Sequence, residues 1–152
     1  MKNILIKSIA IFLFLSFIGI SCKKEKTETP VPIISELPIL YQGCNLKEGK
    51  TVVIENQIGF DTVFNKNQIS QITTLQNVDF SKYEILIGAD VFTHGIYKLE
   101  HDFMKNINSE YIYTVKVYYD LTLPAGTFYY GIIVDKLPSN AIVDFVVKKL
   151  ND

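Results

Sequence analysis

Apolar and polar residues follow different patterns in three successive parts of the chain. Residues 9–20 are almost wholly apolar, and a polar, charged stretch with prolines follows at residues 23–32. Beyond residue 38 the apolar residues recur in short runs between turn-forming residues. We therefore predict an N-terminal segment over residues 1–21, a flexible connection over residues 22–38 and a single folded domain over residues 39–152.

Alternation with a period of two dominates the C-terminal half. Segments 111–120, 127–135 and 141–147 alternate apolar and polar positions, which predicts three strands, each with one buried and one solvent-facing side. Short turn sequences at 123–126 and 137–140 separate them, so we expect antiparallel neighbours in a meander. The predicted inward-facing residues are Tyr111, Tyr113, Val115, Val117, Tyr119, Phe128, Tyr130, Ile132, Val134, Ala141, Val143, Phe145 and Val147.

The N-terminal half of the domain mixes strand and helix patterns. Residues 51–55 are rich in β-branched side chains, and residues 83–92 form an apolar run typical of a central strand covered on both faces. Residues 57–65 have the spacing of a short amphipathic helix, and residues 66–77 fit either a loop or a second helical turn. We predict a mainly β domain of the α+β class, either an antiparallel meander sheet or a small sandwich, of about five to seven strands with one short helix near residues 57–65.

The first residues have the features of a signal peptide. Two lysines make the start positive, and the apolar run has the length of a signal-peptide core, about 7 to 15 residues. A permanent membrane span, the alternative, needs about 20 residues. The run ends at Ser21-Cys22, which resembles the cleavage site of bacterial lipoproteins, with Gly19 and Ile20 in place of the commonest residues. This resemblance implies that residues 1–21 are removed and that acylated Cys22 inserts into the lipid bilayer.

The connection after Cys22 is too polar to bury a core of its own. We expect residues 22–38 to be a flexible tether that holds the domain near the bilayer. Lys23 stands where enterobacterial lipoproteins retained at the inner membrane carry an acid. By this resemblance we expect an outer-membrane lipoprotein of the cell envelope, with the side of the membrane left open.

Charge and cysteine content narrow the classes of function. The chain has a formal net charge of −1 and no arginine. Because binding to a nucleic-acid backbone needs clustered positive charge, we expect no nucleic-acid partner. With Cys22 assigned to lipid, Cys44 has no cysteine left to form a disulfide. We interpret Cys44 as a half-buried apolar residue near a strand edge, with a catalytic thiol as the alternative.

Candidate catalytic or metal-binding side chains are few. His94 and His101 have acids nearby at Glu100 and Asp102, but no metalloprotease, paired-cysteine or calcium-loop motif is present. We interpret both histidines as exposed turn residues, and the alternatives are a zinc site or an acid–base pair of carboxylates. The sequence thus predicts no cofactor, no metal site and no catalytic residue.

Tyrosine is the unusual component of the composition. The chain has nine tyrosines and no tryptophan. Tyr118 lies on the polar side of its predicted strand, and the neighbours Tyr129 and Tyr130 must face opposite sides of theirs. Because tyrosine is favoured at interfaces, Tyr118, Tyr129 and Tyr130 are candidates for a partner-binding surface. Ordinary cross-strand packing of aromatic rings is the alternative.

Residues 78–88 read VDFSKYEILIG. This string resembles a segment of small lipoproteins from Bacteroidota-type bacteria, which in turn are similar to the PrcB-like protease-complex subunit family. The resemblance covers residues 51–149 and includes the last proline turn and strand, while Thr93-His94-Gly95 stands in place of a glycine pair. It implies a non-catalytic lipoprotein that binds and stabilises a secreted protease.

Three hypotheses of function follow. The leading one is a non-catalytic, membrane-anchored lipoprotein that binds a protein partner of the envelope. The second is a lipoprotein that binds a glycan or another small ligand, with a groove beside Tyr118 or Tyr130. The third is a hydrolase with an unrecognised site that uses Cys44, His94 or His101.

Overall fold

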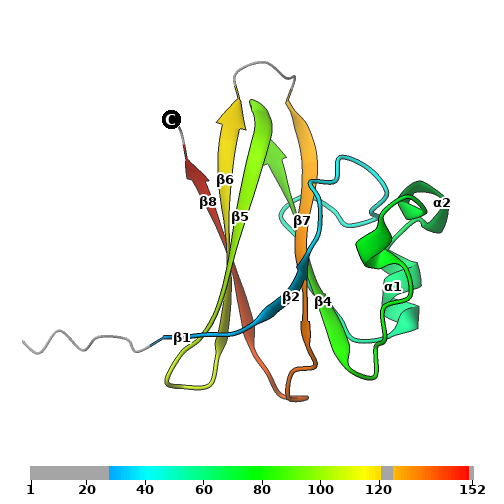
Figure 1. Cartoon of the computed structure of the whole chain (residues 1–152). Coiled ribbons are helices and arrows are strands. Elements are labelled where there is room, and N and C mark those ends of the chain that lie inside the picture. The colour runs from blue at the N-terminus through cyan, green and yellow to red at the C-terminus, as the bar shows by residue number, and fades with distance from the viewer. Residues whose placement is uncertain (1–27, 121–124, 151–152) are drawn as a thin grey trace, which may run out of the picture.

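The computed structural model describes residues 28–120 and 125–150, and within them two β-sheets pack face to face with helices on one side (Figure 1). The predicted signal peptide, Cys22 and the first two residues of the 123–126 turn lie outside the described residues. In chain order the elements are β1 (Thr29–Pro30), β2 (Ile33–Glu36), β3 (Thr51–Ile54), α1 (Gln57–Val63), α2 (Lys66–Ile69), the 3-10 turn η1 (Thr73–Leu75), β4 (Tyr83–Phe92), β5 (Gly95–Lys105), β6 (Tyr111–Asp120), β7 (Gly126–Asp135) and β8 (Val143–Leu150).

Each sheet has four strands within these residues. Sheet A has the order β1-β5-β6-β8, and sheet B has the order β2-β7-β4-β3. In Figure 1 sheet A lies on the left, and α1 and α2 lie beyond sheet B on the right. The mainly β class is confirmed, and of the two architectures left open the fold is the sandwich.

The predicted C-terminal meander is wrong, because successive strands alternate between the sheets. β6 belongs to sheet A, β7 to sheet B and β8 to sheet A. β8 therefore returns beside β6 and runs parallel to it, with Tyr111 opposite Val143 and Tyr118 opposite Leu150. The antiparallel partners of β6 and β7 are the long strands β5 and β4. A short connection requires only that two strands lie close together in space, and it does not require them to pair. Here β7 follows β6, and β8 follows β7, in the opposite sheet each time.

The folded domain begins earlier than residue 39. Thr29–Pro30 pairs with β5 in sheet A, and Ile33–Glu36 pairs with β7 in sheet B. The tether predicted over residues 22–38 is therefore too long at its C-terminal end. Pro32 lies where the chain crosses between the sheets, and both short strands are at sheet edges, where a residue without an N–H is tolerated. Pro30 and Pro32, which suggest a flexible spacer in the sequence, lie where the chain passes from sheet A to sheet B.

β5 has no clear sequence signal because a bulge interrupts its alternation. Its register against β6 shifts between Ile96 and Lys98. After the bulge, Leu99 and Phe103 pack into the core, and the charged residues between them face outward. The prediction of an exposed turn is wrong for His101, which lies within β5, half-buried, with its ring stacked on Tyr113.

Two hydrophobic cores lie on the two sides of sheet B. The first fills the space between the sheets, and all the inward-facing residues predicted for β6, β7 and β8 contribute to it. The second lies between sheet B and the helices and includes Phe60 and Phe64. Leu86 of β4 belongs to the first core, and Ile85 and Ile87 belong to the second. The prediction of a strand covered on both faces is confirmed.

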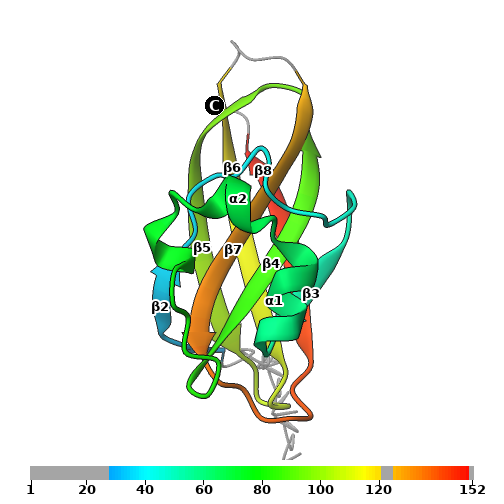
Figure 2. The same cartoon turned by 90° about the vertical axis from the view of Figure 1, so that its right-hand side faces the viewer.

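The helices cover the outer face of sheet B (Figures 1 and 2). The helix predicted over residues 57–65 is found as α1, and the Gly59 N–H donates to the side-chain oxygen of the N-cap residue Asn56 at 2.9 Å. Residues 66–77 contain the one-turn helix α2 and the turn η1. No helix or strand of the described residues lies over the outer face of sheet A.

Candidate binding surface

The outer face of sheet A carries the side chains of β5 and β6 that alternate with the core positions. Tyr113, Val115 and Val117 of β6 are buried between the sheets, so the residues between them face outward. The register sets Lys98 opposite Tyr118 and Glu100 opposite Lys116. We call Lys98, Glu100, Asp102, Lys116 and Tyr118 the sheet A face.

Hydrogen bonds and ion pairs connect the residues of the sheet A face. The Glu100 carboxylate accepts a hydrogen bond from the Lys98 ammonium at 2.6 Å and another from the Tyr118 hydroxyl at 2.8 Å. The Lys116 ammonium lies 2.8 Å from an Asp102 oxygen and 3.9 Å from a Glu100 oxygen. The Lys98 ammonium also lies 5.2 Å from the centre of the Tyr118 ring, which is a cation–π distance. Side chains of both signs are thus held in place on one face.

The same contacts keep these groups in a defined charge state. The hydrogen bonds from Lys98 and then from Tyr118 lower the pKa of Glu100. Hydrogen bonds to carboxylates raise the pKa of Lys98 and of Lys116, and the hydrogen bond to Glu100 raises the pKa of Tyr118. At neutral pH the Glu100 carboxylate is ionised, both lysines are cationic and the phenol of Tyr118 is neutral.

Tyr97 adds a second aromatic ring beside this face. It lies at the bulge of β5, its side chain is 52% exposed, and its ring centre is 6.1 Å from that of Tyr118. A bulge inserts an extra residue and re-aims the side chains near it. The sequence contains no signal for this residue, because the bulge becomes visible only once β5 is paired with β6.

The other two tyrosines predicted for this surface lie elsewhere. Tyr130 is 2% exposed between the sheets, where its ring occupies the space that a side chain at Gly88 would need. Tyr129 points to the opposite side of β7 and packs against the second core beside Leu40. Both faces of sheet B are covered, so neither side chain joins Tyr118. The prediction of one surface that contains all three tyrosines is wrong.

The two histidines occupy different environments. The Nδ1 atom of His101 lies 2.7 Å from the Tyr113 hydroxyl, and burial lowers the pKa of His101 to about 4. His94 is exposed between β4 and β5, as predicted for a turn residue, and its Nδ1 atom lies 3.0 Å from the Thr93 hydroxyl. Within residues 28–120 and 125–150, no three His, Cys, Asp or Glu side chains come together as a metal site.

Cys44 packs against the second core. It is half-buried and forms an isolated bridge with Phe64. Burial raises the pKa of its thiol to about 12. A catalytic cysteine needs a lowered pKa that supplies thiolate at neutral pH, and this site has the opposite effect. The packing fits the interpretation of Cys44 as an apolar residue.

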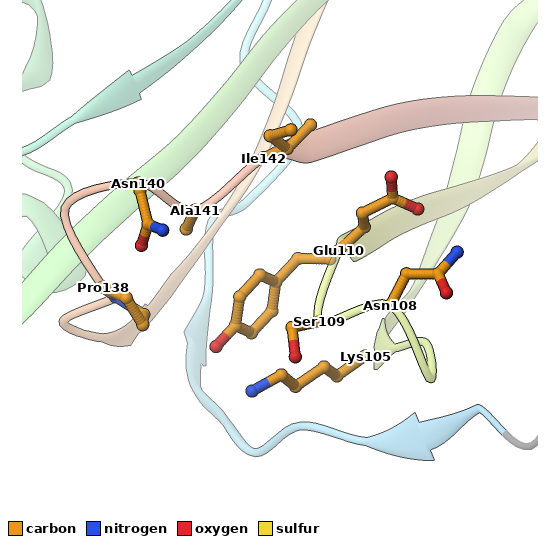
Figure 3. Close-up of a pocket in the computed structure, with 9 residues that line it drawn as sticks. Lys105, Asn108, Ser109, Glu110, Pro138, Asn140, Ala141 and Ile142 are labelled. Carbon is orange, nitrogen blue, oxygen red and sulfur yellow. The ribbon is translucent and has the colours of Figure 1, made fainter.

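A cavity of about 360 Å³ opens at one end of the sandwich, between the β5–β6 turn and the β7–β8 connection (Figure 3). The Lys105 ammonium lies 5.2 Å from the centre of the Tyr111 ring at this cavity. Together with the Ser109 hydroxyl and the Asn140 amide, Lys105 can donate hydrogen bonds to a small polar or anionic group. Neither Tyr118 nor Tyr130 lines it; the lining residues are Lys105, Asn108, Ser109, Glu110, Tyr111, Pro138, Asn140, Ala141 and Ile142.

Comparison with known proteins adds no relative. No family model, no curated protein and no solved structure matches the chain. The resemblance of residues 51–149 to the PrcB-like family stays a prediction. Among the helices of the described residues, none has the length and apolar character to cross a membrane.

Proposed function

We propose that this chain is a non-catalytic lipoprotein of the cell envelope, anchored in the outer membrane through Cys22, whose domain binds a protein partner through the sheet A face and Tyr97. The proposal rests on a difference between the outer faces of the two sheets. The outer face of sheet B is packed under helices as part of the second core. The outer face of sheet A has no covering helix or strand within the described residues.

The chemistry of this face suits a protein partner. Tyr97 and Tyr118 offer a large contact area, and their rings lose little conformational freedom on binding. Lys98 and Glu100 already hold each other in one geometry, which lowers the entropy cost of ordering them in a complex. Fixed charges of both signs select a partner with the complementary pattern. By the resemblance of residues 51–149, the expected partner is a secreted protease.

The proposed anchor lies close to the domain. Because β1 begins at Thr29, six residues separate Cys22 from the first strand, and the seven steps between them span at most roughly 25 Å. The domain would therefore work at the bilayer surface. Labelling with a radioactive fatty acid tests the anchor: the wild-type chain should incorporate label and Cys22→Ala should not, whereas equal labelling of both would contradict it.

Charge reversal on each side of the molecule tests the binding face. Lys98 of the sheet A face and Lys66 of α2 are both ion-paired, with side chains 52% and 63% exposed. Lys98→Glu should retain a co-purifying envelope protein about tenfold less well, or worse, because like charges in an interface cost several kcal/mol. Lys66→Glu, the matched control, should retain it as the wild type does.

The measurement is quantitative co-purification of the detergent-solubilised chain from envelope membranes. A partner held at a stoichiometric level by the wild type and lost only with Lys98→Glu supports the proposal. Absence of a stoichiometric partner, or equal loss with both variants, would contradict it. Thermal unfolding of both variants shows that the reversals leave the fold intact.

A further inference from the structure

β8 is a long and regular open sheet edge. Among the described strands it is the last of sheet A, and its register with β6 runs without interruption from Val143 to Leu150. The strands at the other three edges are short: β1 has two residues, β2 has four and contains a bulge, and β3 has four. The part of β5 that β1 leaves unpaired contains the bulge between Ile96 and Lys98. Proteins blunt their edges with short strands, prolines, bulges and charged side chains. β8 has eight residues and contains neither a proline nor a bulge, so its protection rests on its charges at Asp144, Lys148 and Lys149.

The backbone of β8 presents a regular row of hydrogen-bonding groups at this edge. The Tyr111 N–H donates to the Ile142 carbonyl at 2.8 Å, which fixes the phase of the parallel pairing. The even-numbered residues of β8 therefore bond to β6, and the odd-numbered residues turn their N–H and C=O groups outward. These odd-numbered residues are Val143, Phe145, Val147 and Lys149.

Two charged side chains of β8 have no partner of opposite sign in the described part of the chain. Asp144 and Lys148 are exposed on the outer face of sheet A, and neither forms an ion pair there. Lys148 stands beside another cation, Lys116 of β6. Five other charged residues of sheet A are ion-paired, namely Lys98, Glu100, Asp102, Lys116 and Lys149.

We propose that β8 pairs antiparallel with β8 of a second copy of this chain, about a two-fold axis at Val146. In this register Phe145 exchanges hydrogen bonds with Val147 of the second copy, and Val143 with Lys149, all through groups that already point outward. Asp144 then stands opposite Lys148 of the second copy in a non-hydrogen-bonded pair, where side chains approach closest.

The charges select this register over its neighbours. An axis at Asp144 would set two carboxylates face to face, and an axis at Lys148 would set two ammonium groups face to face. An axis at Phe145 or Val147 would leave each charge opposite an apolar residue. The dimer joins the two A sheets into one continuous sheet and places two sheet A faces side by side. The inference stands on the β8 edge alone and does not need the proposed partner.

Charge exchange tests the register. In full-length chain solubilised in detergent, sedimentation velocity over a range of concentrations should show a monomer–dimer equilibrium. Asp144→Lys and Lys148→Asp alone should each weaken dimerisation about tenfold or more, because each creates two like-charge contacts. The double variant Asp144→Lys/Lys148→Asp should restore it. A wild-type chain that is monomeric throughout, or a double variant that does not recover, would overturn the proposal.

Disulfide trapping tests the position of the axis independently of affinity. Val146 would lie opposite itself at a Cα separation of about 4.5 Å, within the range of a disulfide. Val146→Cys should therefore form a covalent dimer under mild oxidation. The two copies of Lys148 would be about 13 Å apart, so Lys148→Cys is the matched control and should stay monomeric, with Cys44 present in both. Equal cross-linking of the two variants, or none with Val146→Cys, would overturn the register.

Discussion

The hydrogen bond between the His101 imidazole and the Tyr113 hydroxyl joins β5 to the centre of the first core. Tyr113 is 1% exposed, and its buried hydroxyl needs a partner. His101 supplies that partner in its neutral form, because desolvation holds its pKa at about 4 in spite of the opposing effect of Asp102. His101 therefore links the stability of the fold to pH.

The free energy of unfolding should fall as the pH is lowered from 6.5, the ordinary pKa of a histidine, to about 4, the pKa of His101 in the folded chain. In that window the unfolded chain binds a proton that the folded chain does not, so stability is lost with falling pH and the loss levels off below it. At 1.36 kcal/mol per pKa unit the contribution is at most about 3 kcal/mol. Urea unfolding at about pH 7.5 and about pH 4.5 measures it.

Two glutamine variants separate the contribution of His101 to the pH dependence of stability from the contribution of the carboxylates. His101→Gln should lose this part of the pH dependence, since glutamine does not titrate. His94→Gln, which replaces the other histidine of the chain at an exposed turn position, is the matched control. A wild-type slope in His101→Gln would show that the imidazole of His101 is not responsible.

The sequence predicted which side of its strand each side chain faces, because that depends only on local alternation. The spacing of β7 correctly places Tyr129 and Tyr130 on opposite sides, with Tyr130 toward the core. What covers each side depends on residues distant in sequence, so the exposure of these tyrosines could not be derived. The partner of His101 also required the pairing of β5 with β6.

Among the elements, helix α1 begins where the sequence supplies a capping residue, Asn56. Asn56 caps the helix through the Gly59 N–H, and Phe60 and Val63 turn toward the second core. Asn56→Ala should lower the free energy of unfolding by about 1 kcal/mol, because a donor at the helix start loses its acceptor. Asn56→Ser, which restores an acceptor, should recover most of it. Urea unfolding measures both variants, and an unchanged Asn56→Ala would show that the cap contributes nothing.

The elements that the sequence reveals are those with uninterrupted periodicity. Strands β3, β4, β6 and β7 and helix α1 fall where their patterns predict them, and β8, predicted over residues 141–147, is found two to three residues later at Val143–Leu150. β1 and β2 are hidden by prolines in a polar stretch, and β5 is hidden by its bulge. Which strands become neighbours is not encoded locally, so the parallel pairing of β6 with β8 could not be derived from short connections.

The whole molecule has two unlike sides. Helices and the second core lie on one side of sheet B, and the other side of the sandwich presents a sheet with fixed charges and two adjacent tyrosines. A sheet needs only one buried face to be stable, so the outer face of sheet A is available for recognition. Membrane anchoring at Cys22 would hold that face near other envelope proteins.

Site-specific photo-cross-linking in intact cells tests the proposed binding face most directly. A photoreactive benzophenone amino acid replaces Tyr97 beside the sheet A face or, as the control, Ile58 of α1, which is 81% exposed on the opposite side. We expect a protein adduct of one defined mass from position 97 that is absent from position 58 and is lost when Lys98→Glu is added. Absence of an adduct at position 97, or the same adduct at both positions, would contradict a binding role for the sheet A face.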